Sequence, residues 1–416
     1  MKRRDFLQLL SVSGLACSAP IGLSKAHAAT RPDQFFVTIY AEGGWDTTAF
    51  CDPKGNANRS DGNGPVNTYQ TSDIGTAGNF KYAPNLVGFE ENGLGAKNKT
   101  FFDKHYNNMT IINGFEALSS GHSINSAGSG NMNGLPSIGA LFAASHFADS
   151  STSYVSFGGN SATRNLVPVS KIDSKTKVSD FINPNMVHSD AAYDVFKNYR
   201  TARQDALLAN EGAVVRRGAM GRLFNAVNGD ASLSALDTFL PAAGLQNGIN
   251  GQAEFVAAAF ASGLTAAANL EVGGFDTHSN NDKYQTSNLG KMLDGVETLY
   301  AEAERHGIAD RMTVYLCSEW TRTPFYNDES EGKDDYGIGS AILISPSNKN
   351  GNGLLQLTDA ECNLLKVNTN NFQADENGLE LSQHHIHRSL RRFLNINSDL
   401  QTAFDLPVEQ DLELFL

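Results

Sequence analysis

Short, nearly continuous apolar runs recur along the chain and alternate with longer segments that have helical spacing. The runs are rich in β-branched and aromatic residues, which is typical of strands buried on both faces of a sheet. We expect strands at residues 35–40, 110–112, 154–157, 312–317 and 341–345. We expect helices at residues 204–228, 253–268 and 286–306. This order predicts an α/β protein with a mainly parallel central sheet and helices on both faces.

The segment 286–306 has the clearest helical pattern. Its apolar residues recur every three or four positions, and Gly307 follows as a stop signal. These residues are Leu289, Met292, Leu293, Val296, Leu299, Tyr300 and Ala303. The apolar run 312–317 comes directly afterwards, so the chain returns from a helix into a buried strand, as parallel sheets require.

The first 29 residues have the parts of an export signal. Arg3 and Arg4 are adjacent, an apolar stretch rich in small residues extends from about 7 to 23, and residues 26–28 read Ala-His-Ala, a cleavage pattern. We predict that residues 1–29 are a twin-arginine signal peptide, that the Tat translocase is a partner during export, and that the mature protein is periplasmic or secreted. The alternatives are a buried helix, a lipoprotein site at Cys17, or a membrane anchor, for which the stretch is short.

Residues 30–416 contain no repeat and no low-complexity linker, so we expect one domain with a long surface loop at about residues 52–80. The full chain of 416 residues has a formal net charge of −13 and becomes more acidic without the signal. Such a charge disfavours nucleic acid and anionic lipid as partners, and no second apolar segment is long enough for a membrane span. Three cysteines follow residue 29, an odd number that excludes a complete disulfide framework but leaves room for one bridge.

Acidic and imidazole side chains follow three of the apolar segments. Asp46 comes after the first strand, Asp276 and His278 after a short apolar run, and Glu319 after the strand at 312–317. Ligands bind at the carboxyl ends of strands in open parallel sheets, and carboxylate with imidazole suits Zn²⁺, Mn²⁺ or Mg²⁺. Each residue alone has an ordinary alternative, such as a helix cap or a loop hydrogen bond. Their recurrence at strand ends favours a divalent metal site.

Several motifs resemble those of one family. They are Gly43-Gly44-Trp45-Asp46, Gly274-Phe275-Asp276-Thr277-His278 and Ser318-Glu319-Trp320-Thr321-Arg322-Thr323-Pro324, with the twin arginines, residues 134–139 and the tail 384–394. Over nearly its whole mature length the chain resembles the twin-arginine-exported, sulfatase-like family numbered fifteen-oh-one among domains of unknown function. That family is related to the alkaline phosphatase superfamily, so the resemblance implies an alkaline-phosphatase-like fold.

The resemblance also implies a site with two metal positions. A late histidine ligand is expected near the C-terminal helix, although the histidines there also fit a polar helix start that faces solvent. The candidate metal ligands are Asp46, Asp276, His278, Glu319, Asp335, His385 and His387. For Glu319 the alternative is a side chain that hydrogen-bonds to a ligand.

His122 matches a Ser–His position of the family. Its neighbours Ser120 and Ser123 are therefore candidates for a hydroxyl nucleophile. Arg322 is a candidate for binding an anionic substrate, because a guanidinium group matches phosphate and sulfate in geometry; the alternative is an ion pair with Glu319.

The chain departs from the family at one motif. The family usually carries Asp-His-Gly-His-Gly, whereas this chain reads Asp335-Tyr336-Gly337-Ile338-Gly339. A tyrosine stays protonated at neutral pH and an isoleucine has no ligand atom, so Tyr336 and Ile338 remove two donors. Asp334 and Asp335 remain as possible ligands of a harder ion.

Two functions remain open. The first is an exported metal-dependent hydrolase of small phosphate or sulfate esters with a partly degenerate metal site. The second is a non-catalytic periplasmic or cell-surface module that keeps the hydrolase fold. Convergence of the candidate ligands on one point favours the first, and their scatter favours the second. No dinucleotide-binding glycine motif or haem-attachment motif supports a redox enzyme.

Overall fold

The computed structural model describes residues 33–118, 122, 134–148, 150, 152–159, 161–172, 190–213, 216–217, 220–221, 236–327, 331–408 and 410–415. The predicted signal peptide, residues 1–29, lies outside this part of the chain, as do Ser120 and Ser123.

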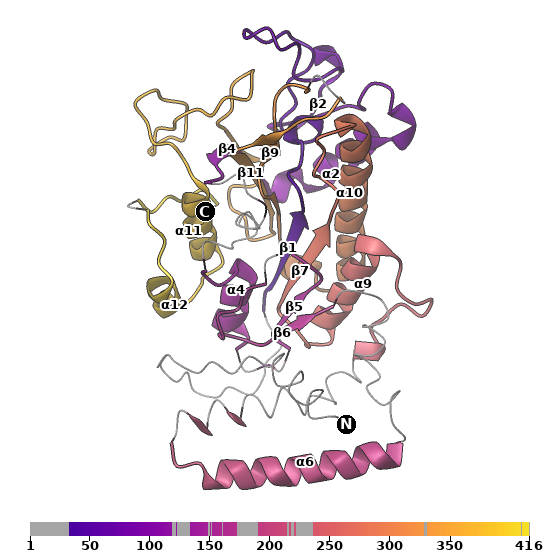
Figure 1. The fold of residues 1–416 in the computed structure, drawn as a ribbon, viewed down its shortest axis with the longest axis vertical. Helices are drawn as coiled ribbons and strands as arrows, with labels where there is room; N and C mark the ends of the chain where they lie inside the picture. The colour runs from indigo at the N-terminus through magenta and orange to yellow at the C-terminus, as the bar shows by residue number, and fades with distance from the viewer. Residues whose placement is uncertain are drawn as a thin grey trace.

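An eight-stranded sheet forms the centre of the molecule (Figure 1). In spatial order the strands are β12 (Gly353–Gln356), β4 (Met109–Glu116), β11 (Ile338–Ile344), β8 (Met312–Ser318), β1 (Phe35–Ala41), β7 (Ala267–Val272), β5 (Tyr154–Ser156) and β6 (Val169–Lys171). Within this sheet β11 alone is antiparallel to its neighbours, β8 and β4, and the remaining pairs are parallel. The predicted mainly parallel sheet is therefore confirmed.

The two faces of the sheet bury two separate hydrophobic clusters. On β1, Phe35, Val37 and Ile39 belong to one cluster, whereas Phe36 and Tyr40 belong to the other. This alternation follows from the strand period of two, and it explains why a strand covered on both sides is apolar at nearly every position.

Helices cover both faces, as expected (Figure 1). One cluster includes residues of α2 (Leu94–His105), α9 (Gly248–Ala261) and α10 (Asn281–Arg305). The other includes residues of α4 (Ile138–His146), α11 (Gln383–Phe393) and α12 (Ser398–Ala403). The helix α6 (Asp190–Asn210) lies apart from these layers in Figure 1, with Val195 and Tyr199 strongly exposed.

Two predicted helices have wrong boundaries. The segment expected at 204–228 overlaps α6, which begins earlier and ends at Asn210. Residues 211–213 are not helical, residues 216–217 and 220–221 are helical, and residues 222–228 lie outside the described part of the chain. The segment expected at 253–268 combines α9 with the start of β7. Gly263 has a φ of 75° and ends the helical run, a conformation that the small apolar residues around it do not reveal.

The region 52–80 contains little regular structure but is partly packed. It holds a short 3-10 turn (Thr71–Asp73) and β2 (Gly75–Ala77), which pairs with β3 (Phe80–Tyr82). Val66 and Tyr69 are buried in it. Among the described residues, no helix is both long and apolar enough to cross a membrane.

Candidate functional site

Besides His122, which follows β4, the candidate site is formed by three loops at the carboxyl edge of the sheet. They follow β1, β7 and β8, which are adjacent and parallel, so their ends meet at one place. Gly43 lets the first two loops touch. Its φ is 109°, and a Cβ atom there would lie 2.4 Å from the backbone nitrogen of Asp276.

Gln285 of α10 fastens the same two loops to each other. Its side-chain oxygen accepts a hydrogen bond from the Asp46 backbone N–H at 2.8 Å. Its side-chain nitrogen donates to the Phe275 carbonyl and to the Thr277 hydroxyl, each at 3.0 Å. The amide is fully buried, so these bonds offset its desolvation and fix the positions of both loops.

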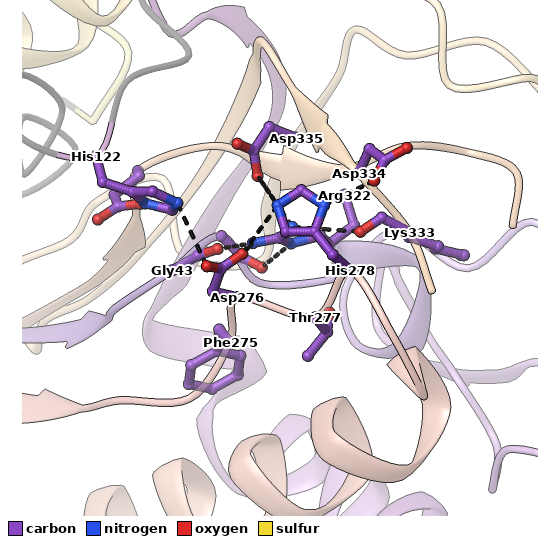
Figure 2. A network of polar contacts seen from close by, with 12 residues as sticks. Gly43, His122, Phe275, Asp276, Thr277, His278, Arg322, Lys333, Asp334 and Asp335 are labelled. Atoms are coloured by element: carbon purple, nitrogen blue, oxygen red, sulfur yellow. Dashed lines mark hydrogen bonds and ion pairs between the residues drawn. The ribbon is translucent and has the colours of Figure 1, made fainter. Parts of the chain in front are cut away.

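Arg322 of β9 (Thr321–Arg322) holds two of the candidate ligands (Figure 2). Its Nη2 atom lies 3.1 Å from Asp276 Oδ1, and its Nη1 atom lies 2.9 Å from Asp335 Oδ1. Asp335 belongs to β10 (Asp335–Tyr336), which pairs with β9 so that Asp335 stands opposite Arg322. The guanidinium group therefore positions both carboxylates.

The remaining donors of Arg322 bond to the main chain. Its side chain is fully buried, and it donates to the backbone oxygens of Gly43, Gly44 and Lys333. Arg322 thus forms four hydrogen bonds, to Gly43, Gly44, Lys333 and Asp276, in addition to its ion pair with Asp335. The ion pairs of Arg322 are with Asp276 and Asp335, and among the described residues it has none with Glu319.

Asp46 lies in a separate, fully buried ion pair with Lys333. The Lys333 ammonium group is 2.8 Å from Asp46 Oδ2, and the carboxylate also accepts hydrogen bonds from Asn281 and Thr48. Burial acts to raise the pKa of Asp46, but Lys333 and these hydrogen bonds outweigh it and hold the pKa below its ordinary value. A lysine therefore supplies the positive charge beside the carboxylate that the resemblance makes a metal ligand.

His122 is oriented by a buried carboxylate. Its Nδ1 atom lies 2.6 Å from Glu319 Oε2, and the hydroxyl of Tyr40 donates to Glu319 Oε1 at 2.7 Å. Burial acts to lower the pKa of His122, but the hydrogen bond and charge of Glu319 raise it overall. In the neutral ring, Nδ1 carries the proton towards Glu319, so Nε2 keeps its lone pair. Nε2 lies 3.6 Å from Asp276 Oδ2.

These contacts gather a group of side chains that fits a metal ion. Ligand atoms of His122, Asp276 and Asp335 lie within 4.8 Å of one another. A ligating histidine whose other nitrogen is held by a carboxylate is the usual arrangement in zinc sites, and Glu319 has that place here. One imidazole and two carboxylates suit Zn²⁺ or Mn²⁺, and three protein ligands leave positions open.

His278 lies beside this group. Its Nε2 atom is 3.2 Å from Asp276 Oδ1 and 3.7 Å from Asp335 Oδ1. Its Nδ1 atom is 2.6 Å from Asp334 Oδ1, and this hydrogen bond lowers the pKa of Asp334. Figure 2 shows the ring between the aspartates. The Asp-x-His loop and the Asp334-Asp335 pair thus meet, although they lie far apart in the sequence.

A cavity of about 520 Å³ is lined by two of the three candidate ligands, His122 and Asp276. Four carboxylates line it, namely Glu42, Glu271, Asp276 and Glu319. Burial raises the pKa of Glu271 and of Glu319. A cavity with this charge repels an anion, so an anionic ester requires a bound cation to enter it.

The remaining candidates lie elsewhere. His385 caps α11, with its Nδ1 atom 3.1 Å from the Ser382 nitrogen, and His387 is buried with its ring against Tyr315. Tyr336 is half-buried, and burial raises the pKa of its hydroxyl. Ile338 is buried at the start of β11. None of these side chains belongs to the group of His122, Asp276 and Asp335 that fits a metal ion among the described residues.

Sequence patterns missed Lys333 and the roles of two other residues. Lys333 directly precedes Asp334 and Asp335 but carries no motif of its own. The sequence predicts no metal-binding role for His122, and it predicts Glu319 as a ligand or as the partner of a ligand without identifying which one. Their pairing joins residues 197 positions apart, which a single sequence cannot reveal.

One known protein family matches part of the chain. Residues 196–345 match DUF1501, a protein family of unknown function. The DUF1501 match covers less than half of the chain, but it includes Asp276, Arg322 and Asp335. The comparison with curated proteins found no match.

Solved structures share low identity with the chain. Ps i-CgsB is 10% identical with a TM-score of 0.36, over 93% of this chain and 76% of that one. The alkaline phosphatase of the Antarctic bacterium TAB5 is 11% identical with a TM-score of 0.31, over 78% and 95%. A Bacteroides thetaiotaomicron protein from work on glycosaminoglycan metabolism is 10% identical with a TM-score of 0.33, over 91% and 78%. Likeness at this level carries no argument about function.

Proposed function

We propose that the chain is an exported protein that binds one divalent metal ion through His122, Asp276 and Asp335 and hydrolyses a small phosphate or sulfate ester there. The observation that carries this proposal is the convergence of the three ligand atoms beside an open cavity. The bound ion would polarise an ester oxygen and lower the pKa of a bound water. The twin-arginine signal predicted for residues 1–29 supports export to the periplasm or beyond, through the Tat translocase.

The chain's own residues would prepare the site in three ways. Glu319 holds the His122 ring so that Nε2 presents its lone pair. Arg322 orients Asp276 and Asp335 and neutralises part of their charge. The carboxylates around the cavity repel an anionic ester except close to the metal ion. The metal ion would therefore be needed both to bind the ester and to hydrolyse it.

The ion pair of Asp46 with Lys333 supports a single metal position. The ammonium group already neutralises the carboxylate that the resemblance assigns to a second ion. With Tyr336 and Ile338 in place of histidines, we propose that the second position is degenerate.

Metal binding to the mature protein tests the proposal. We expect about one Zn²⁺ or Mn²⁺ per chain by calorimetry and elemental analysis. Glu319→Gln should weaken metal binding by about 10- to 100-fold, because it alters the hydrogen-bond partner of the ligand His122. Asp276→Asn should weaken it by more than about 100-fold, because it removes the charge of a ligand itself. Asp294→Asn, on the exposed side of α10, is the matched control and should bind normally. A folded protein that binds no divalent ion would contradict the proposal.

A second candidate is a non-catalytic module with the same fold. The cations Lys333 and Arg322 favour it, because both already pair with carboxylates that the resemblance makes metal ligands. It predicts no turnover of p-nitrophenyl phosphate or p-nitrophenyl sulfate and no change in melting temperature with EDTA. Metal-dependent hydrolysis of either ester would exclude it.

A further inference from the structure

A second cavity, of about 440 Å³, lies between α11, α12 and the segment that follows α12. Its volume is within the range of about 300–1,000 Å³ that small-molecule sites have. It shares no residue with the cavity beside Asp276. The residues that line it are Arg388, Arg391, Arg392, Gln401, Thr402, Asp405, Leu406 and Asp411.

Two of its three arginines have carboxylate partners. Arg388 pairs with Asp411 and lies 3.6 Å from Asp405. Arg392 lies 3.0 Å from Glu413 and 3.9 Å from Asp411. These pairs are partly exposed and account for the acidic side chains along this wall.

Arg391 differs from both. It is only 3% exposed, and its Nη1 atom donates to the Phe404 carbonyl at 2.5 Å. Among the described residues, its Nε atom has no hydrogen-bond partner, and no carboxylate lies within ion-pair distance. Burial lowers the pKa of Arg391 to about 10, and the charge of Asp405 only partly opposes this. A buried guanidinium group without a carboxylate partner is costly unless another anion pairs with it.

We propose that this cavity binds a small organic anion through Arg391, with a carboxylate, phosphonate or sulfonate type of oxyanion as the recognised group. A planar guanidinium fork matches such oxygens in pairs, and α11 supplies two further arginines at the rim. Gln401 and Thr402 provide neutral polar contacts, and Leu406 provides an apolar one for the body of the ligand. The site is independent of the proposed metal site.

Titration of the whole mature protein with benzoate, phenylphosphonate and benzenesulfonate tests this proposal, with benzamide as the neutral analogue. We expect at least one anion to bind by calorimetry and to raise the melting temperature, whereas benzamide and sodium chloride at equal ionic strength do not. Arg391→Gln should weaken binding by at least about tenfold, as the loss of a charge-assisted hydrogen bond predicts.

Three further variants test whether the binding is specific to this cavity. Arg305→Gln, on the exposed part of α10, should leave binding unchanged. Asp276→Asn should also leave it unchanged, because that residue belongs to the proposed metal site. If Arg391→Gln does not fold, Arg392→Gln, which has a more exposed side chain, should weaken the binding measurably.

The proposal would be overturned if no organic anion bound more tightly than benzamide, or if inorganic phosphate alone bound. It would also be overturned if Arg391→Gln, or Arg392→Gln in its place, bound the anion as tightly as the unmodified protein. That result would indicate general stabilisation by salts excluded from the protein surface, which does not depend on one arginine.

Discussion

Replacing Lys333 by methionine removes the charge beside Asp46 and keeps much of the side-chain volume. In the structure the Lys333 Nζ atom is fully buried, 2.8 Å from Asp46 Oδ2 and 3.2 Å from the Val66 carbonyl. Removal of one partner from a buried ion pair costs about 3–5 kcal/mol, because the other charge stays desolvated. Thr48 and Asn281 still donate to Asp46, so we expect a loss of about 3 kcal/mol in the free energy of unfolding.

A surface pair of the same residue types is the control. Lys97 Nζ lies 2.6 Å from Asp294 Oδ2, with both side chains more than a third exposed. Lys97→Met should change the free energy of unfolding by less than about 1 kcal/mol. The double variant Lys333→Met with Asp46→Asn should recover most of the lost stability, since no buried charge remains.

The contribution of Asp46 to stability should also depend on pH in opposite ways in the unmodified protein and in Lys333→Met. In the unmodified protein the pKa of Asp46 is lowered, so its contribution is present above the unfolded-state pKa and is lost as the pH falls through the folded-state pKa. In Lys333→Met, burial dominates and raises that pKa. Asp46 of the folded variant then takes up a proton more readily than it does in the unfolded chain. The loss in free energy of unfolding relative to the unmodified protein is therefore largest at neutral pH and becomes smaller as the pH falls.

Urea unfolding at pH 7 and pH 5, followed by tryptophan fluorescence, measures these effects. The chain has two tryptophans, Trp45 and Trp320, and both are buried at this site. A variant Lys333→Met within about 1 kcal/mol of the unmodified protein would refute the reasoning, as would a double variant no more stable than the single one.

Two further predictions concern a glycine and the export signal. Gly43→Ala should cost about 1–3 kcal/mol and weaken metal binding, because its φ of 109° is strained for alanine and the new Cβ meets the Asp276 backbone; urea unfolding and calorimetry check this, and unchanged values would contradict it. Replacing Arg3 and Arg4 by lysine should retain the full-length precursor inside the cell, as seen by fractionation and immunoblotting, whereas normal export would exclude the Tat route.

Sequence patterns predicted the centre of the fold well. The strands β1, β8 and β11 are apolar at nearly every position because helices cover both of their faces, so their runs are easy to recognise. Helix ends were harder to predict. The boundary between α9 and β7 depends on the left-handed conformation of Gly263, inside a segment of small apolar residues that fits either element.

The sequence predicts that candidate residues meet at one edge of the sheet, but it does not predict how they pair with one another. Carboxylates after parallel strands share one edge by geometry, which is why Asp276 and Glu319 lie near each other. Charge pairing across the edge depends on the path of each loop. The bonds of Lys333 to Asp46 and of Glu319 to His122 join segments whose approach no local pattern encodes.

The position of β1 in the sheet also determines when the chain can fold during its synthesis. The Trp45 backbone N–H, just after β1, donates to the Ser318 hydroxyl at the end of β8, and these residues are 273 positions apart. Contacts of such long range make folding slow. The central strand therefore waits for most of the chain to leave the ribosome, and a nascent chain stopped before β8 has one side of β1 open for pairing with other chains.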